Sequence, residues 1–533
     1  MHAEHSLRAD VLVAALVLVS LLVTRSLLRS KSWNARMRGR ALPPGPRGMP
    51  FIGNLFNMPQ SKAWYGFRDL AQNTYGASGD VTYFQVMGRH VMVLGSPTSI
   101  SEFLEKRTSN TSDRLVTPLV RLTGLDWILG LVPYGPLWRA YRRALWQHFH
   151  PGVLPRYQTV QNAITRKFLL KLMHKPEDFK QHVRFVLAAT LLKVVYGIDV
   201  EDENHEIIRM IDVALEGPSQ AFVPGKYLVD VFPLLQYVPE WLPGANFQKM
   251  FAKWRKANLQ MKEILFKTRN TAFAENPLPG SMPIVDALLL RFPNGLADPS
   301  LNYEMLVENV AAVTFEAGTD TTYTTVLASF VALSLYPEAQ KKAQAELDAV
   351  VGRERLPELH DRESLVYVKA IIMESLRWHN VTPLGIAHRT ILDDEIQGYF
   401  VPAGTTLVAN IWACMHDPTE YPDPADFRPE RFIHDGKIDT TVRDPFTIVF
   451  GSGRRYGRSS YRICPGRYFA NDSLFLIIAS VLHMFDIGPP VDDHGQMIKV
   501  EPWMTDGFLS YLEDTRCTIR PRSSEMELLR MLE

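Results

Sequence analysis

The chain has 533 residues, with 58 Lys and Arg against 57 Asp and Glu, so its formal net charge is +1. This balance gives no electrostatic reason to bind nucleic acid. With 46% hydrophobic and 22% charged residues, the composition excludes a disordered chain and a protein made mostly of membrane spans. The only cysteines are Cys414, Cys464 and Cys517. They cannot form a disulfide framework, which favours a reducing compartment.

An apolar run, Val11–Val23, lies near the start of the chain. It is shorter than the ~20 residues that cross a bilayer, but Arg25 can lengthen the span by snorkelling. Basic residues without any acid follow it, at Arg25, Arg29, Lys31, Arg36, Arg38 and Arg40. Because positive charge stays on the cytoplasmic side, we expect residues 1–30 to form a signal anchor, with the remaining chain cytoplasmic. A buried or interfacial helix is the alternative.

A basic and proline-rich hinge, residues 31–50, follows the expected anchor. Proline fixes φ and lacks an N–H, so Pro43–Pro50 predicts a stiff extended spacer. Residues 51–533 show no repeat and no internal linker, which indicates a single large domain.

Helical periodicity dominates this domain, as in Leu301–Leu335 and Pro337–Val351. Short strands are predicted at Val81–Val86, Val91–Leu94 and Thr405–Ala409. Four prolines make Phe222–Pro243 an irregular segment. The fold class is therefore mainly α with small β-sheets. The sequence contains neither a dinucleotide-binding nor a P-loop glycine motif.

Cys464 stands where Pro465 and Gly466 lead into a predicted apolar helix, Tyr468–Phe485. The start of a helix and the flanking arginines both favour a thiolate, the form that binds metal. A lone cysteine is a poor zinc site, but one thiolate suffices as the axial ligand of a haem iron. A buried structural cysteine is the alternative.

Glu374 and Arg377 stand at i and i+3 of a predicted helix, Val368–His379, where they can pair on one face. Such pairs usually lie on the surface, where they contribute little stability. Arg431 could turn this pair into a buried network.

A polar stretch, residues 317–322 (AGTDTT), interrupts an apolar helix predicted to begin near Tyr303. Glycine and threonine weaken a helix, so we expect a local opening here that admits a ligand or water. Asp320 and Thr321 offer a carboxylate and a hydroxyl for proton transfer. An ordinary polar patch is the alternative.

Trp138 and Arg142 share one helix face at i and i+4, offering an indole donor and a guanidinium to an anionic group. A solvated basic helix surface is the alternative.

In order and spacing, these segments resemble the cytochrome P450 family of haem-thiolate monooxygenases, over nearly the whole chain. The resemblance rests on the anchor and hinge, WRAYRR (138–143), AGTDTT (317–322), ESLR (374–377), PERF (429–432) and ICPGR (463–467). Residues 393–418 are similar as well, and Phe222–Leu235 is similar to fungal members of secondary metabolism. The resemblance implies the cytochrome P450 fold and a microsomal protein, anchored in the endoplasmic reticulum membrane with its catalytic domain on the cytoplasmic face.

The resemblance implies a haem b whose iron is bound by Cys464. Asp320 and Thr321 would be the catalytic pair that delivers protons to dioxygen, and Gly318 would leave room for it. Glu374, Arg377 and Arg431 would brace the cysteine side of the haem.

Three residues would contact the haem propionates on the same resemblance: Trp138, Arg142 and His388, with Arg389 beside the last. Substrate-facing walls would lie near residues 116–125, 222–228, 310–314, 381–386 and 503–508.

The approach to the cysteine departs from the family pattern F-x-x-G-x-R-x-C. Phe450, Gly453 and Arg455 begin the pattern, but the cysteine follows fourteen residues after Phe450 instead of seven. The extra residues are best placed at Tyr456–Arg462, so either Arg455 or Arg462 serves a propionate. The insertion is a polar surface loop, a disturbance of the hairpin that shields the sulfur, or an error in gene prediction.

The resemblance implies insertion of one oxygen atom of O2 into a small, mostly apolar substrate, such as a secondary metabolite or xenobiotic. Electrons would come from NADPH through a separate cytochrome P450 reductase, with cytochrome b5 as a further donor, since the chain has no flavin domain. The alternatives are a haem-thiolate isomerase or dehydratase, and a haem-defective relic.

Overall fold

The computed structural model describes residues 31–75, 80–202, 226–273, 282–291, 301–453, 463–492 and 494–532, with single positions between 207 and 221. The expected anchor, residues 1–30, lies outside these ranges. Within them, no helix combines the length and the apolar character needed to cross a bilayer.

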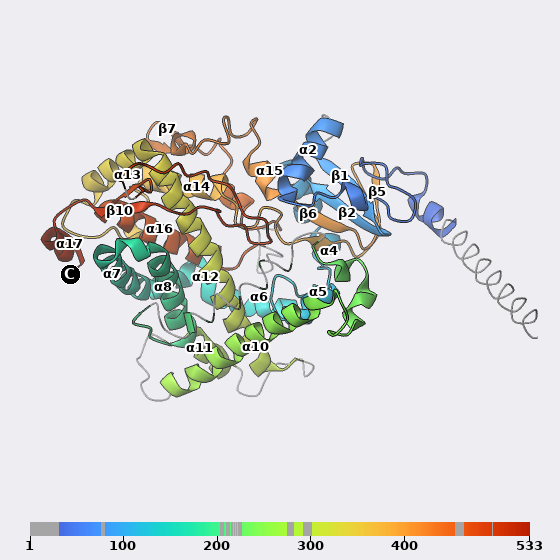
Figure 1. Cartoon of the computed structure of the whole chain (residues 1–533), viewed down its shortest axis with the longest axis horizontal. Helices are drawn as coiled ribbons and strands as arrows, with labels where there is room; N and C mark the ends of the chain where they lie inside the picture. Colours follow the sequence, from blue (N-terminus) through green and yellow to red (C-terminus); the bar gives the residue numbers. More distant parts are fainter. Residues whose placement is uncertain are drawn as a thin grey trace, which may run out of the picture.

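Helices form most of the described chain (Figure 1). The longer helices are α2 (Ala63–Tyr75), α6 (Pro136–Phe149), α7 (Gln158–His174), α8 (Phe179–Leu191), α10 (Asn246–Phe273), α12 (Tyr303–Leu335), α13 (Pro337–Val350), α14 (Val366–Trp378) and α16 (Arg467–Met484). The shorter ones are α3 (Pro97–Ile100), α4 (Thr108–Thr111), α5 (Pro118–Leu122), α11 (Ile284–Arg291), α15 (Ile411–Met415) and α17 (Glu525–Leu532), with π-helical turns at Ser101–Glu105 and Leu192–Tyr196.

The main sheet lies at one end of the molecule, beside α2 (Figure 1). Its strands are β1 (Val81–Val86), β2 (Arg89–Leu94), β6 (Thr406–Ala409) and β3 (His388–Arg389), in that spatial order. Only β2 and β6 are parallel. Three two-stranded sheets join β4 (Asp394–Ile396) to β5 (Tyr399–Val401), β7 (Ile433–His434) to β8 (Lys437–Ile438), and β9 (Phe485–Gly488) to β10 (Thr518–Pro521). These elements confirm a mainly helical fold with small sheets.

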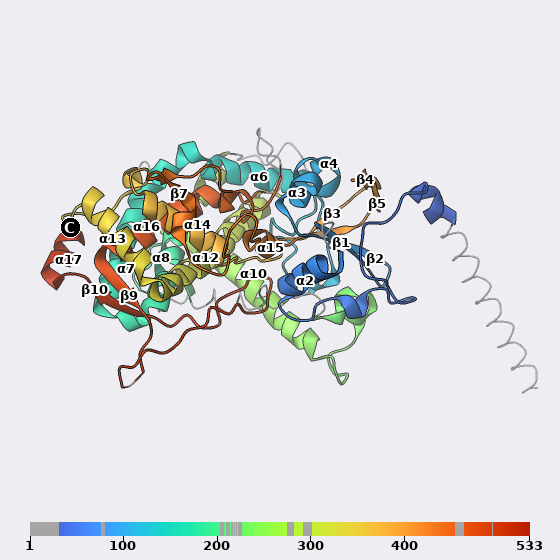
Figure 2. The ribbon, with the colours of Figure 1, turned by 90° about the horizontal axis from the view of Figure 1, so that it is seen from above.

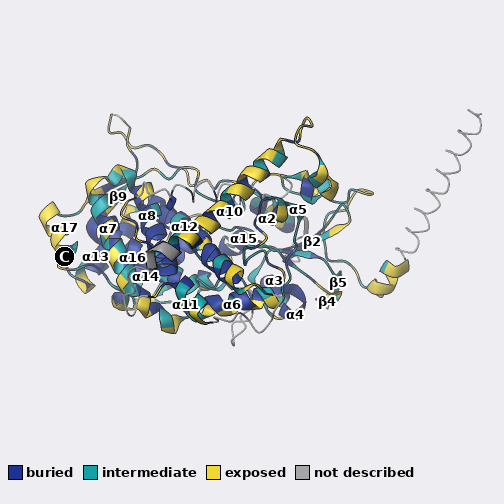
Figure 3. Ribbon diagram, turned by 90° about the horizontal axis from the view of Figure 1, so that it is seen from below, coloured by how far each residue is buried: buried dark blue, intermediate teal, exposed yellow. Residues whose placement is uncertain are grey.

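Helix α12 crosses the centre of the molecule (Figures 1 and 2). It contacts α8, α10, α11, α14 and α16, and its middle is buried while α10 and α17 expose one face (Figure 3). Asn302 caps it by accepting a hydrogen bond from the N–H of Met305. A helix that is apolar on nearly every side belongs in a core, which explains this position.

The expected opening at residues 317–322 is not observed, because α12 continues unbroken from Tyr303 to Leu335. The hydroxyls of Thr319 and Thr321 donate to the carbonyls of Phe315 and Ala317, each at 2.7 Å. These bonds add to the backbone ladder without replacing it, so the threonines are accommodated inside the helix.

The proline-rich hinge runs along β1 and is not a free spacer. The Tyr83 N–H donates to the Pro44 carbonyl at 2.7 Å. A side chain at Gly45 would lie 1.8 Å from the Tyr83 carbonyl oxygen, so only glycine allows this approach. Within the segment predicted to be irregular, the described part forms two short 3-10 turns, Leu228–Asp230 and Pro233–Tyr237.

Candidate active site

Cys464 lies in the loop that leads into α16 and is half-buried. Its N–H donates to the Phe450 carbonyl at 2.8 Å, so the two ends of the cysteine loop meet. Burial raises the pKa of the Cys464 thiol, and the Gly466 amide and the guanidiniums of Arg142 and Arg467 only partly offset this. The start of α16 and the arginines do favour the thiolate, as the sequence indicates, but burial outweighs them. A bound metal cation has to displace the thiol proton.

The insertion and both candidate arginines, Arg455 and Arg462, lie outside the described residues. Phe450 and Gly453 lie inside them. Phe450 stacks on Phe446 with ring centroids 5.1 Å apart, which anchors the start of the cysteine loop.

Arg142 connects helix α6 to the cysteine loop. Its Nη1 donates to the Ile463 carbonyl at 2.7 Å, next to Cys464. Its guanidinium lies 5.9 Å from the ring centre of Trp138, so the two residues share one face of α6, as their spacing predicts. Burial lowers the pKa of Arg142 to about 10. A half-buried cation beside a cysteine suits the binding of an anionic group.

Asp113 joins two further segments to this region. Its carboxylate accepts a hydrogen bond from the Tyr134 N–H at 3.1 Å, and its carbonyl accepts one from the Arg389 N–H at 2.9 Å. Tyr134 packs against Trp138 with ring centroids 5.2 Å apart. Strand β3, with His388, is thereby brought to the same region as α6.

Arg114 is a buried cation that the sequence analysis missed. It is 5% exposed, and its Nη1 donates to the carbonyls of Ile386 and Ala387. Those carbonyls directly precede His388, whose Nδ1 lies 2.8 Å from the Thr111 carbonyl oxygen. Arg114 belongs to no sequence motif. It lies beside His388 because the β-bridge between Asp113 and Arg389 joins the two segments.

Asp320 is held by two side chains that are far away in the sequence. Arg184 of α8 donates to its Oδ1 at 2.8 Å, and the Tyr511 hydroxyl donates to its Oδ2 at 2.5 Å. The Asp320 side chain is 1% exposed. Burial raises the pKa of Tyr511, and the negative charge of Asp320 raises it further. The carboxylate is therefore fixed in position, one residue before Thr321.

Helix α12 presents a strip of accessible surface beside this carboxylate. Ala317 is exposed and Thr321 is half-buried, while Glu316 and Asp320 are buried. Gly318 faces α8: a side chain there would lie 2.9 Å from Leu191 Cδ1, so glycine also lets the two helices pack closely. The surface at Ala317 and Thr321 can receive a ligand.

Two of the predicted substrate walls bond to residues that lie two positions beyond other walls, Asp230 and Ser510. The Leu119 N–H donates to the Asp230 carboxylate at 3.2 Å. The Ser510 N–H donates to the Val381 carbonyl at 2.8 Å. Residues 222–225 lie outside the described ranges.

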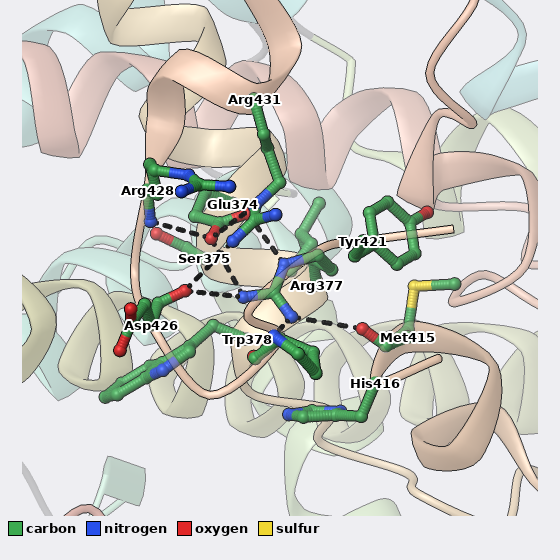
Figure 4. A network of polar contacts seen from close by, with 12 residues as sticks. Glu374, Ser375, Arg377, Trp378, Met415, His416, Tyr421, Asp426, Arg428 and Arg431 are labelled. Carbon is green, nitrogen blue, oxygen red and sulfur yellow. Dashed lines mark hydrogen bonds and ion pairs between the residues drawn. The ribbon is translucent and has the colours of Figure 1, made fainter. Parts of the chain in front are cut away.

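Glu374, Arg377 and Arg431 form the buried network that was considered from the sequence (Figure 4). Arg377 donates to both carboxylate oxygens of Glu374, at 2.7 and 2.8 Å, and Arg431 donates to Oε1 at 3.1 Å. The Arg428 N–H donates to the same oxygen at 2.8 Å. Arg377 also donates to the carbonyls of Met415, Pro424 and Asp426. These bonds fix the chain between α14 and the PERF segment, which is a structural role.

Residues 43–509 match the sequence model of the family described as Cytochrome P450. The chain belongs to the cytochrome P450 family. It is 39% identical to the cytochrome P450 monooxygenase COX2 of Coprinopsis cinerea, over 92% of this chain and 90% of that protein. A cytochrome P450 monooxygenase of Armillaria gallica is 36% identical over 93% and 96% of the two chains. The tryptamine 4-monooxygenase of Psilocybe cyanescens is 35% identical over 92% and 95%. The protein is therefore a haem-thiolate monooxygenase.

The residues present fit the haem with a cysteine thiolate ligand that this family carries. Cys464 supplies one sulfur, and no other cluster of metal-binding side chains occurs in the described ranges. Arg142 places a half-buried cation beside the sulfur, and Arg114 and His388 lie on two further segments that are joined to each other and to α6. An anionic porphyrin requires such cations around its carboxylates.

Tyr511→Phe tests the clamp on Asp320. Removing one donor from a charged acceptor costs about 1.5–3 kcal/mol, so the free energy of unfolding of the variant should be lower than that of wild type by about this amount. The measurement is unfolding by urea, followed by fluorescence. Tyr336→Phe removes a hydroxyl at the end of α12 and should unfold close to wild type. An unchanged stability in Tyr511→Phe would show that this hydroxyl does not hold Asp320.

Proposed function

We propose that Cys464 is the axial ligand of a haem b and that the enzyme inserts one oxygen atom of O2 into a small, mostly apolar organic substrate. The observation that carries this proposal is the position of Cys464, before α16 and next to the half-buried cation Arg142. Haem iron with a thiolate ligand supplies the activation of dioxygen. Trp138, Arg142, His388 and Arg455 or Arg462 would hold the propionates.

Asp320 and Thr321 would handle protons on the substrate side. Arg184 and Tyr511 hold the Asp320 carboxylate in place. The Thr321 hydroxyl donates to the Ala317 carbonyl, which leaves its oxygen lone pairs available to accept a proton donor at the accessible surface of α12. A fixed acid beside an oriented hydroxyl is suited to passing a proton to a bound ligand.

Thr321→Ala should divert reducing equivalents from product to hydrogen peroxide, because a proton carrier at the accessible surface is lost. The measurement is the ratio of peroxide released to NADPH consumed, which should rise several-fold. Thr325→Ala is the matched control, since Thr325 makes the same bond to the carbonyl one turn before it but is buried. An equal ratio in wild type and Thr321→Ala would remove Thr321 from this role.

Electrons would come from an NADPH–cytochrome P450 reductase, with cytochrome b5 as a second donor. Arg139 and Arg143 are exposed on α6, on either side of Arg142 and close in sequence to its contact with the cysteine loop. An exposed basic surface near the metal ligand suits an acidic electron-transfer partner.

A membrane anchor at residues 1–30 would hold the protein on the cytoplasmic face of the endoplasmic reticulum membrane. Large apolar side chains exposed on residues 228–242 support this proposal, among them Leu234, Tyr237 and Trp241, each at least 75% exposed. That segment projects from the body (Figure 2). Exposed apolar patches of this kind are typical of membrane contact.

The substrate class can be tested directly. Tryptamine, the substrate in the name of one relative, is small and largely aromatic, in keeping with the proposal. Ligands that displace water from the haem iron change its absorbance, so a panel of indoles, terpenes and polar sugars should show changes only with the first two. A response limited to sugars would contradict an apolar substrate.

A further inference from the structure

Glu316 is a buried acid on α12 that the site described above does not use. Glu316 is 4% exposed, and neither of its carboxyl oxygens has a hydrogen-bond partner among the described residues. An ionised carboxylate without a partner is very costly inside a protein, so Glu316 carries a proton. Burial raises the pKa of Glu316 to about 8, and the negative charge of Asp320 raises it further.

The neighbours of Glu316 are acids and one phenol. Asp320 follows one helical turn later on α12, which places the two Cβ atoms about 5–6 Å apart. Tyr196, in the π-helical turn after α8, has its pKa raised by burial and by the charges of Glu308 and Glu316. Arg184, the cation of this region, is paired with Asp320. Glu316 therefore stands next to the carboxylate that is already assigned to proton delivery.

We propose that Glu316 is a proton reserve for Asp320. The protonated Glu316 gives its proton to the Asp320 carboxylate, directly after a side-chain rotation or through one bridging water molecule. Glu316 becomes a carboxylate and Asp320 a carboxylic acid. Asp320 then passes the proton toward Thr321, and Glu316 must be protonated again through water before the next cycle. This inference rests on the proposed role of Asp320.

The need for a reserve follows from the burial of Asp320. A monooxygenase forms one water molecule for each oxygen atom it inserts, so protons must enter the site in every cycle. Both oxygens of Asp320 are bound by Arg184 and Tyr511, and its side chain is 1% exposed. A neutral acid one turn away can supply that proton from within the protein.

Infrared spectroscopy of the full-length holoenzyme tests the protonation of Glu316 without any turnover. Wild type at pH 7 should show a protonated-carboxyl C=O band that is lost in Glu316→Gln and disappears in wild type above about pH 8. Glu304→Gln, an exposed acid at the start of α12, should keep the band. Identical spectra for wild type and Glu316→Gln at pH 7 would overturn the proposal.

The pH dependence of the free energy of unfolding of the same variants is an independent test of the protonation of Glu316. A carboxyl whose pKa is about 8 folded and 4.5 unfolded binds more protons in the folded state between these values, so wild type loses stability as the pH rises through that interval. Glu316→Gln should lack this loss. Parallel stability curves for the two proteins between pH 5 and 8 would overturn the proposal.

Reductase-supported oxygen consumption then tests delivery. General acids contribute ~10²–10⁴-fold to rates, and losing a remote reserve should cost about tenfold in Glu316→Gln and less than twofold in Glu304→Gln. A full rate in Glu316→Gln with normal haem content would overturn the reserve. If wild type does not bind haem through cysteine, the proposed function is contradicted instead. The infrared result on the protonation of Glu316 does not depend on that outcome.

Discussion

Replacing Cys464 by serine is expected to abolish monooxygenase activity and the absorbance band that reduced, carbon monoxide-bound haem shows with a thiolate ligand. A serine hydroxyl is far less acidic than a thiol and does not donate electron density to iron as a thiolate does. The measurement is the reduced, carbon monoxide difference spectrum of the purified variant, with haem content determined in parallel.

Cys517→Ser is the matched control for that variant. Cys517 is also half-buried and free, but it lies just before β10, which pairs with β9 at the end of α16 opposite Cys464. It should keep the thiolate band and the activity. A thiolate band that survives in Cys464→Ser would show that another residue binds the iron.

Replacing Glu374 by glutamine is expected to destabilise the protein by about 3–5 kcal/mol. The substitution removes the charge that pairs with Arg377 and Arg431, and an unpaired buried charge carries a penalty of that size. Arg377 and Glu374 are both 0% exposed, so water cannot compensate. Unfolding by urea, followed by fluorescence, measures the difference, and haem retention should fall with it.

Glu338→Gln is the control that separates the effect of burial on stability from the effect of i, i+3 spacing. Glu338 pairs with Lys341 at the same i, i+3 spacing, but the two side chains are 75% and 69% exposed. A surface pair contributes little stability, so this variant should unfold close to wild type. Equal destabilisation by the two substitutions would contradict the account of the buried network.

The sequence predicted the elements that carry a strong pattern. Leu301–Leu335 corresponds to α12 within two residues, and Val81–Val86 to β1 without a difference. Periodicity depends on residues that are close together in the sequence, so one sequence is enough to detect it. The continuity of α12 through residues 317–322 was not predicted, because local propensity cannot show that hydroxyls bond within the helix while packing holds it.

The site was predicted only where a motif marks it. Trp138 and Arg142 share a helix face, and their spacing is enough to find them. Arg184 and Tyr511 carry no motif and meet Asp320 only in the folded chain, across 136 and 191 residues. Glu316 was overlooked because a glutamate in a helix is ordinary until its burial is known.

The role of the insertion stays a prediction. Residues 454–462 lie outside the described chain, so the choice between Arg455 and Arg462 is open. The bond between Cys464 and Phe450 shows that the ends of the loop meet. Its length alone therefore does not exclude the haem geometry of the family.

The ligand of the iron is the claim on which the other proposals depend. The direct measurement is the absorbance of the purified full-length protein after reduction and exposure to carbon monoxide, with the coding sequence of residues 456–462 verified. We expect the red-shifted band of a thiolate-bound haem. A band typical of a nitrogen ligand, or a protein without haem, would contradict it.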